Sequence, residues 1–360
     1  MALPMPLDVG IRVFLLFFFV LNLVLALTYL ERKVIGRIQQ RLGPMRTGPF
    51  GLLQAPADAI KLLTKEDLIP ANADKLVFKA APYAVFVPLF VALIAVPFTS
   101  DLLVRSMDMG IFYFVAVSSF SIVGVVMAGY GSSNKYALLG GVRAAAQMVS
   151  YELPLVMSIL GIAMLTESLN LKTIVEQQGI APFIILQPVG LFIFIVSALA
   201  ELNRSPFDIP VAESEVVGGP YVEYSGMRWG IFYLAEYANL FAICALGTLL
   251  FLGGWTWPFL GAQDPSLTER VLGVVWFFGK TFIFIFAMFW LRATLPRLRI
   301  DQLMTFAWKL LLPLAFVNLF ITGVYLINGW PSWTLFLMSA IVIIAAGYIV
   351  YARENRRVPA

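Results

Sequence analysis

The chain has 360 residues, of which 60% are hydrophobic and 13% are charged, with a formal net charge of +4. This composition excludes an ordinary soluble domain, because a soluble core of this length does not need so much apolar surface. There is no histidine, and the single cysteine, Cys244, lies inside an apolar run. We therefore expect no haem, iron–sulfur, zinc or copper site and no internal disulfide. The absence of a P-loop pattern argues against a nucleotide-driven pump.

Apolar stretches of about 20 residues, long enough to cross a hydrocarbon core of roughly 30 Å, recur along the chain. We predict nine spans, near residues 11–30, 77–98, 110–130, 144–165, 182–202, 229–253, 271–292, 304–327 and 332–352. These runs are continuous, without the alternation of barrel strands, so the spans should be helices. The sequence predicts an all-α polytopic membrane protein that forms a single membrane domain over residues 1–360.

Lysine and arginine set the expected orientation, because basic residues concentrate in loops on the cytoplasmic side. With the N-terminus outside, the cytoplasmic segments are residues 31–75, 131–143, 203–228, 292–303 and the C-terminal tail. These segments hold 18 of the 25 basic residues. The first span should be a retained anchor, since it lacks the basic start and small-residue cleavage site of a signal peptide.

The first cytoplasmic loop, residues 31–75, begins with the basic segment ERKVIGRIQQR. Over residues 52–66 the apolar side chains project to one side, and Asp58 and Lys61 project to the other. This pattern predicts an amphipathic helix at the cytoplasmic interface, too short and too charged to span. The helix either only anchors the loop or, with the basic segment before it, frames an opening between membrane and cytoplasm.

Three carboxylates, Glu152, Glu201 and Glu236, lie within predicted spans or at their ends. Such a carboxylate costs roughly 2.5–3.5 kcal/mol unless it is protonated or faces water or a partner. Arg143 cannot neutralise Glu152 within their common helix, because nine residues turn the two about half a circle apart. One buried acid can simply bond to a neighbouring helix and fix its packing. Three acids on consecutive spans favour a functional role.

The polar segment 200–228 is acidic, although a cytoplasmic loop is expected to be basic. It holds five carboxylates: Glu201, Asp208, Glu213, Glu215 and Glu223. Its prolines and glycines prevent one continuous helix, so we expect the backbone to fold back and to gather the carboxylates in a small volume. Gathered carboxylates repel one another, and some hold a proton. The plainer alternative is a solvated acidic loop.

The cytoplasmic segments closely resemble one family. They read ERKVIGRIQQRLGP, GPFGLLQAPADAIKLLTKEDLIP, GSSNKYALLGGVRAAAQMVSYELPL, AELNRSPFDIPVAESEVVGGPYVEYSGMRW and LRATLPRLRIDQLM. The resemblance is to the H subunit of NADH:quinone oxidoreductase, respiratory complex I, which is called subunit 1 in mitochondria. It runs from about residue 10 to residue 325, and the ninth span lies beyond it.

The resemblance implies a membrane subunit at the foot of the peripheral arm, which forms the quinone chamber and starts a line of charged residues toward the proton-pumping subunits. It assigns to the chamber and its entrance Arg32, Arg37, Asp58 and Lys61. It assigns to the proton relay Glu152, Glu201, Asp208, Glu213, Glu215, Glu223 and Glu236. NADH, FMN and the iron–sulfur clusters would lie on partner subunits of the peripheral arm, beside small and antiporter-like membrane subunits. The substrate would be a quinone, ubiquinone or menaquinone, in a bacterial cell membrane rather than an organellar one.

Three other functions remain open from the sequence. A proton- or sodium-coupled secondary transporter also uses intramembrane acids, but it predicts repeated halves and broken helices at matching positions, which the sequence does not show. The related subunit of a membrane-bound hydrogenase would pass electrons to protons, whereas the dense match across the first cytoplasmic loop favours the quinone enzyme. A purely structural scaffold is the third alternative.

Overall fold

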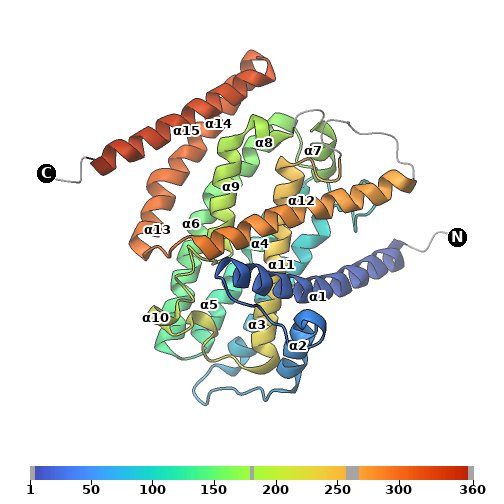
Figure 1. Cartoon of the computed structure of the whole chain (residues 1–360), viewed down its shortest axis with the longest axis vertical. Coiled ribbons are helices and arrows are strands. Elements are labelled where there is room, and N and C mark those ends of the chain that lie inside the picture. The colour runs from blue at the N-terminus through green and yellow to red at the C-terminus, as the bar shows by residue number, and fades with distance from the viewer. Residues whose placement is uncertain (1–4, 179–181, 257–266, 356–360) are drawn as a thin grey trace.

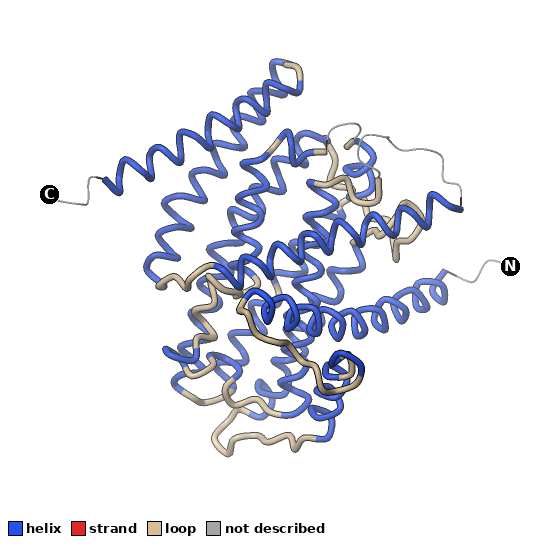
Figure 2. Tube along the Cα trace, viewed as in Figure 1, coloured by secondary structure: helices blue, strands red, loops and turns tan. Residues whose placement is uncertain are grey.

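The computed structural model describes residues 5–178, 182–256 and 267–355, and within these ranges the chain is helical with no strand (Figures 1 and 2). The α-helices are α1 (Met5–Ile38), α2 (Gln54–Thr64), α3 (Lys75–Ala92), α4 (Gly110–Ser119), α5 (Ser121–Gly131), α6 (Lys135–Thr166), α7 (Leu171–Gln177), α8 (Phe183–Leu186), α9 (Pro188–Glu201), α10 (Glu213–Val216), α11 (Gly226–Phe251), α12 (Leu267–Thr294), α13 (Ile300–Phe306), α14 (Leu312–Asn328) and α15 (Ser332–Asn355). Short 3₁₀ turns lie at Pro49–Gly51, Leu93–Ala95 and Gly219–Tyr221, and a π turn at Ala307–Leu311 joins α13 to α14.

Seven helical segments of the described chain are long and apolar enough to cross a membrane: Val9–Ile38, Lys75–Ala95, Gly110–Gly131, Lys135–Thr166, Gly226–Phe251, Val271–Thr294 and Ile300–Asn328. They coincide with seven of the nine predicted spans, which confirms an all-α polytopic membrane protein. The other two predictions coincide with shorter apolar helices, Pro188–Glu201 and Ser332–Ala345. Several helices continue beyond the predicted limits into the loops, as α1 does to Ile38.

The predicted span at 182–202 is broken into α8 and α9 at Gln187, directly before Pro188. Proline has no N–H and fixes its own φ, so it suits the first position of a new helix better than the interior of a continuous one. The Gln187 amide donates to the Gly161 carbonyl at 3.3 Å and to Thr322 Oγ1 at 2.9 Å. This side chain therefore ties the break to α6 and α14.

Helix α11 is the most enclosed span of the described chain, and every residue from Tyr237 to Phe251 is buried. It packs against α2, α3 and α12, and α1 lies beside α11 and α12 (Figure 1). Aromatic rings fill the space between them, among them Phe19, Phe98, Phe241 and Phe278, with centroids 5.7–6.4 Å apart. Because α11 is fixed on several sides, it gives the polar residues on its cytoplasmic half a rigid support.

Lys280 on α12 holds the far end of α11. Its Nζ donates to the carbonyl oxygens of Leu252, Gly254 and Thr256 at 2.7, 3.1 and 2.7 Å. These carbonyls follow the last turn of α11, where a helix leaves its acceptors without internal partners and carries partial negative charge. A buried ammonium is tolerated here because all three of its protons are bonded.

We expect Lys280→Met to destabilise the chain by about 1–3 kcal/mol, because three buried carbonyls lose a charged donor. The thermal inactivation midpoint of the detergent-solubilised complex should therefore fall by several degrees. Lys309→Met, which removes an exposed lysine from the π turn, should leave the midpoint within error and serves as the control. Equal midpoints for both variants would show that the three bonds contribute nothing.

Candidate functional site

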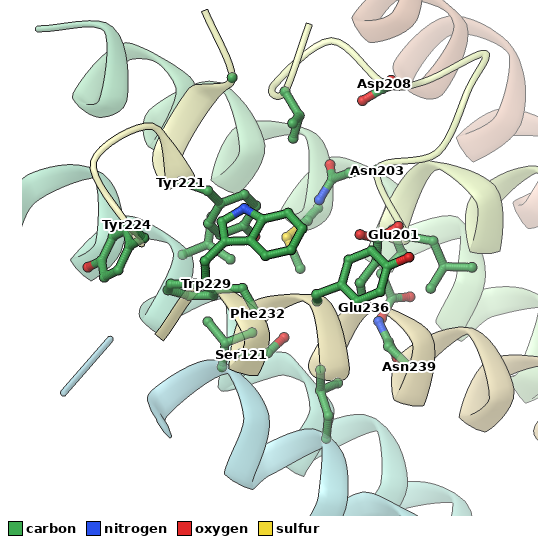
Figure 3. A pocket seen from close by; sticks show the side chains of 18 of the residues that line it. Ser121, Glu201, Asn203, Asp208, Tyr221, Tyr224, Trp229, Phe232, Glu236 and Asn239 are labelled. Carbon is green, nitrogen blue, oxygen red and sulfur yellow. The ribbon is translucent and has the colours of Figure 1, made fainter. Parts of the chain in front are cut away.

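A cavity of about 460 Å³ lies where the acidic loop 203–228 covers the cytoplasmic half of α11. Three carboxylates, from Glu201, Asp208 and Glu236, line it together with the rings of Trp229 and Tyr221. Figure 3 shows Glu201 and Glu236 on one side of the cavity and the rings of Trp229, Tyr221 and Tyr224 on the other. An apolar cavity of this size with a few converging polar groups is typical of a binding site for a small molecule.

Glu201 ends α9 and is the least compensated acid of the cavity. One of its carboxylate oxygens is buried without a hydrogen-bond partner, and within the described ranges no lysine or arginine forms an ion pair with it. Glu152 lies close enough to Glu201 to repel it. Glu201 is therefore the acid of this site whose charge has the fewest described partners.

Asp208, in the loop itself, is in an intermediate position. Burial raises the pKa of Asp208 above its usual value, and this effect exceeds the opposing attraction of Arg297 and Arg292. Arg297 Nη2 lies 3.0 Å from Asp208 Oδ2 and is half-exposed. Because Arg297 lies in the segment after α12, this ion pair links that segment to the acidic loop.

Arg204 forms a buried charge cluster beside the cavity that the sequence did not reveal. Its side chain is 1% exposed, and its guanidinium lies 2.9 Å from Glu31 and 3.1 Å from Glu236. Arg292 bonds the other oxygen of Glu31. The cluster therefore contains two arginines and two glutamates, from α1, α11, α12 and the start of the acidic loop. Its charges balance, which is what makes their burial tolerable.

Hydroxyl and aromatic groups on one face of α11 connect this cluster to the first loop. Trp229 stacks on Tyr233 with ring centroids 5.3 Å apart, and the Tyr233 hydroxyl donates to that of Tyr237 at 3.1 Å. The Arg204 guanidinium lies over the Tyr237 ring, 4.7 Å from its centroid. These residues recur every four positions, so a helix places them on one face.

The predicted entrance residues meet between α1 and α2. Arg32 Nη1 lies 2.7 Å from Asp58 Oδ2, and Lys61 Nζ lies 3.6 Å from Asp58 Oδ1. Partial burial acts to raise the pKa of Asp58, but Arg32, Gln54 and Lys61 outweigh it and hold the pKa below its usual value. Arg32 also bonds Tyr233, which lines the cavity. Arg37 is exposed near the end of α1.

Helix α2 confirms the predicted amphipathic element, with Leu53, Ile60 and Leu63 more than half exposed on its apolar side. Such a face suits contact with lipid or a partner subunit rather than water. The charged face carries Asp58 toward α1, so the helix sits between the apolar exterior and the cavity's polar edge.

The acidic loop keeps its shape through close backbone contacts. Gly219 has φ +65°, and a Cβ on it would lie 2.0 Å from the Pro210 carbonyl oxygen. A Cβ on Gly140 of α6 would lie 2.5 Å from Gly219 Cα. Only glycine fits at both positions, 140 and 219. Tyr224 then stacks on Phe78 of α3 at 4.0 Å and closes the loop.

Three of the other predicted relay acids, Glu152, Glu215 and Glu223, do not line the cavity. Glu152 on α6 contacts Ser119. Glu215 pairs with Arg143 at 2.8 Å and is half-exposed, and Glu223 accepts a hydrogen bond from Asn134 at 2.6 Å. The side chain of Glu213 is not among the described residues. The expectation that the loop gathers all its carboxylates in one volume is thus not met, because Glu215 and Glu223 turn toward α6 and the turn before it.

The described acids of the site lie among arginines, hydroxyl groups and aromatic rings. Among the residues that the structure describes, no group of three or more histidine, cysteine, aspartate or glutamate side chains is placed to hold a metal ion. Sequence reasoning found Glu201, Asp208 and Glu236, which line the cavity, but it did not single out Glu31, Arg204 or Arg292. A signal for Arg204 was present, since it is the basic residue directly after the α9 span.

Comparison with known proteins joins these observations to one family. The family model described as NADH dehydrogenase matches residues 11–323. The chain is 52% identical over 309 residues to the H subunit of the NADH-quinone oxidoreductase of Dehalococcoides mccartyi strain CBDB1, a match that covers 86% of this chain and 84% of the relative. It is 52% identical over 305 residues to the H subunit of Brevibacillus brevis strain 47, covering 85% and 89%. The H subunit of D. mccartyi strain ATCC BAA-2266 is 48% identical over 336 residues, covering 93% and 92%.

These matches confirm the resemblance seen in the cytoplasmic segments and favour it over a transporter or a hydrogenase subunit. They extend over most of the chain and include the α1–α2 region, the acidic loop and α11. The relatives are bacterial and carry the name of one component of a multi-subunit enzyme. This multi-pass membrane chain therefore belongs to the NADH dehydrogenase family, alongside the H subunits of bacterial NADH-quinone oxidoreductases.

Proposed function

We propose that this chain is the membrane subunit of an NADH-quinone oxidoreductase and that its cavity forms the membrane part of the quinone chamber. The observation that carries this proposal is the meeting of Glu201, Asp208 and Glu236 with aromatic rings in one cavity of about 460 Å³. Flat rings such as those of Trp229 and Tyr221 suit contact with a quinone ring and its apolar tail. The relatives' shared name supplies the substrate class.

The proposed path of the quinone begins near α2. The headgroup enters between the helices beside the Arg32–Asp58 pair and passes the α11 face that carries Tyr233. Reduction itself occurs at an iron–sulfur cluster of a partner subunit, because NADH, FMN and the clusters belong to the peripheral arm. This chain has no histidine and a single buried cysteine to offer such a group.

Reduction of a quinone adds negative charge that protons must balance. Carboxylates that interact strongly titrate as a group rather than singly, so a charge change at one redistributes protons among the others. Glu201 and Glu152 repel each other, and Glu236, which lines the same cavity as Glu201, pairs with Arg204. The proposed output is a protonation change carried along Glu201 and Glu152 into the membrane interior.

The orientation inferred from the basic residues places the cavity on the cytoplasmic side, with the N-terminus outside. The peripheral-arm subunits would then cover the acidic loop. Glu215 of this loop is partly exposed there, as are Arg143 and Arg297, which pair with acids of the loop. The lateral neighbours would be small and antiporter-like membrane subunits. Purification of the tagged chain tests this assembly: it should bring down iron–sulfur subunits and NADH-dependent quinone reduction, whereas a transporter would run alone or as a homo-oligomer.

We expect Asp58→Asn to raise the KM for quinone about twofold to fivefold with little change in kcat. The Arg32–Asp58 pair is partly exposed, so its loss should cost less than about 1 kcal/mol. Because the pKa of Asp58 is lowered, the pair's contribution is present above the ordinary aspartate pKa and is lost only as pH falls through the lowered value. Between pH 6 and 8 the pair should therefore stay intact, and the KM of the wild type should not rise through its loss. This pH range lies well above the ordinary carboxylate pKa of about 4.

Glu66→Gln is the control for Asp58→Asn, since Glu66 is an exposed acid just beyond α2. It should leave both kinetic constants unchanged. A fall in kcat at constant KM in Asp58→Asn would place Asp58 in the chemistry and contradict its assignment to the entrance.

A further inference from the structure

The third span is interrupted where it faces Glu152. Helix α4 ends at Ser119 and α5 begins at Ser121, with Phe120 between them. The Phe120 N–H bonds the Val117 carbonyl at 3.2 Å, three residues back, where a regular helix would use the carbonyl four residues back. Ser119 is therefore the last residue of α4 before this irregular turn, and its side chain contacts Glu152 of α6.

The Ser119 hydroxyl has two acceptors for one proton. It lies 2.8 Å from the Val115 carbonyl oxygen, and it also contacts the Glu152 carboxylate. A serine hydroxyl is a single donor with two acceptor lone pairs. It can donate to Glu152 or to Val115, but not fully to both. When it donates to Val115 it is free to accept a hydrogen bond from a protonated Glu152.

Among the residues that the structure describes, Glu152 has no cation to share its charge. Arg143, on the same helix, is paired with Glu215, and the Glu152 carboxylate forms no ion pair with any described lysine or arginine. Glu201, at the end of α9, is close enough for the two carboxylates to repel each other. Ser119 is thus the one donor that the described residues supply to this carboxylate. Hydrogen bonds to a charged acceptor are about twice as strong as neutral ones.

We propose that Ser119 is a positioning residue whose hydroxyl donates to Glu152 when this acid is ionised and turns to the Val115 carbonyl when the acid takes up a proton. The inference rests on the proposed function, in which Glu152 exchanges protons. It adds that a neutral side chain on the third span adjusts the charge state of Glu152 without carrying charge itself.

The test compares variants of the assembled complex in membranes. Turnover with quinone is divided by NADH oxidation with a hydrophilic artificial acceptor, which bypasses the cavity and measures assembled enzyme. Ser119→Ala should lower this ratio about threefold to tenfold, because Glu152 loses one charge-assisted hydrogen bond. Ser119→Thr keeps the hydroxyl and should restore the ratio to within about twofold of wild type, which a simple packing role would not produce. Ser119→Cys retains the volume but only a weak donor, and should behave like Ser119→Ala.

Ser118→Ala is the matched control, because Ser118 also bonds the Val115 carbonyl, at 3.0 Å, but has no bond to Glu152. It should leave the ratio unchanged. The proposal is overturned if Ser119→Ala and Ser119→Cys turn over like the wild type, or if Ser119→Thr fails as they do. Glu152→Gln distinguishes failure of this proposal from failure of the proposed function. If Glu152→Gln lowers the ratio while the Ser119 variants are normal, the proposed function stands and only the role of Ser119 is removed.

Discussion

Replacing Arg204 by methionine is expected to prevent stable assembly of this subunit. Arg204 is 1% exposed and lies within 3.1 Å of carboxylate oxygens from both Glu31 and Glu236. Methionine fills much of the space, but it leaves Glu31 with Arg292 alone and removes the arginine that pairs with Glu236. Removing one partner from a buried ion pair costs about 3–5 kcal/mol, because the remaining charge stays buried without compensation. This is a large fraction of the stability of a typical domain.

The measurement for Arg204→Met is the amount of complex recovered from membranes and its thermal inactivation midpoint. Adding Glu31→Gln to Arg204→Met should recover part of the assembly, since it removes the acid that is most deeply buried in the cluster. Lys172→Met is the control, because Lys172 belongs to a half-exposed pair with Glu176 at 3.8 Å. Normal yield and midpoint in Arg204→Met would mean that the cluster does not hold α1, α11 and α12 together.

Glu201→Gln should instead leave the complex assembled and lower its quinone-coupled turnover roughly tenfold to hundredfold, the range of a lost proton-transfer group. Glutamine has the same shape and can neither bind nor release a proton. Glu201 has no ion-pair partner among the described residues, so the change strands no cation. It also relieves repulsion with Glu152, so the stability of the subunit should not fall.

Glu176→Gln serves as the control for Glu201→Gln, because Glu176 is an exposed acid on α7 that does not line the cavity. NADH oxidation with a hydrophilic acceptor should be normal in both variants. Wild-type rates of quinone reduction and proton translocation in Glu201→Gln would remove Glu201 from the relay. A loss of assembled complex would show that its role is structural.

The contrast between these two variants separates structural charge from functional charge. The Arg204 cluster is balanced and joins several helices, and its central pair, Arg204 and Glu31, is deeply buried, so it stabilises the site. Glu201 and Glu152 repel each other and form no ion pair with any described lysine or arginine. Both kinds of charge carry the same energetic cost of burial, and only the partners distinguish them.

The fold was predictable because the thickness of the bilayer constrains each membrane-spanning segment separately. A span needs about 20 apolar residues in a row, and this signal is present within each segment regardless of the rest of the chain. This signal predicted Gly226–Phe251 and the other long spans, and the amphipathic pattern over residues 52–66 predicted α2. The break at Gln187 was missed because hydropathy does not register a change of helix at Pro188.

The charge pairs of the site could not be predicted, because they join residues far apart in sequence. Glu31 stands beside Arg32 and Lys33 and reads as locally compensated. Its actual partners, Arg204 and Arg292, lie 173 and 261 residues away. Insertion cost could point to Glu201 and Glu236 as unusual, but only the packing of α1, α11 and α12 shows which acid has a partner.

Infrared difference spectra of the assembled complex, recorded on reduction of bound quinone, test most directly whether the cavity carboxylates exchange protons. We expect a change in the absorption of protonated carboxyl groups in the wild type, and its reduction or shift in Glu201→Gln. The Glu176→Gln control should give the wild-type spectrum. A wild-type spectrum with no carboxyl change, or one that Glu201→Gln leaves identical, would contradict a proton-exchanging role for this site.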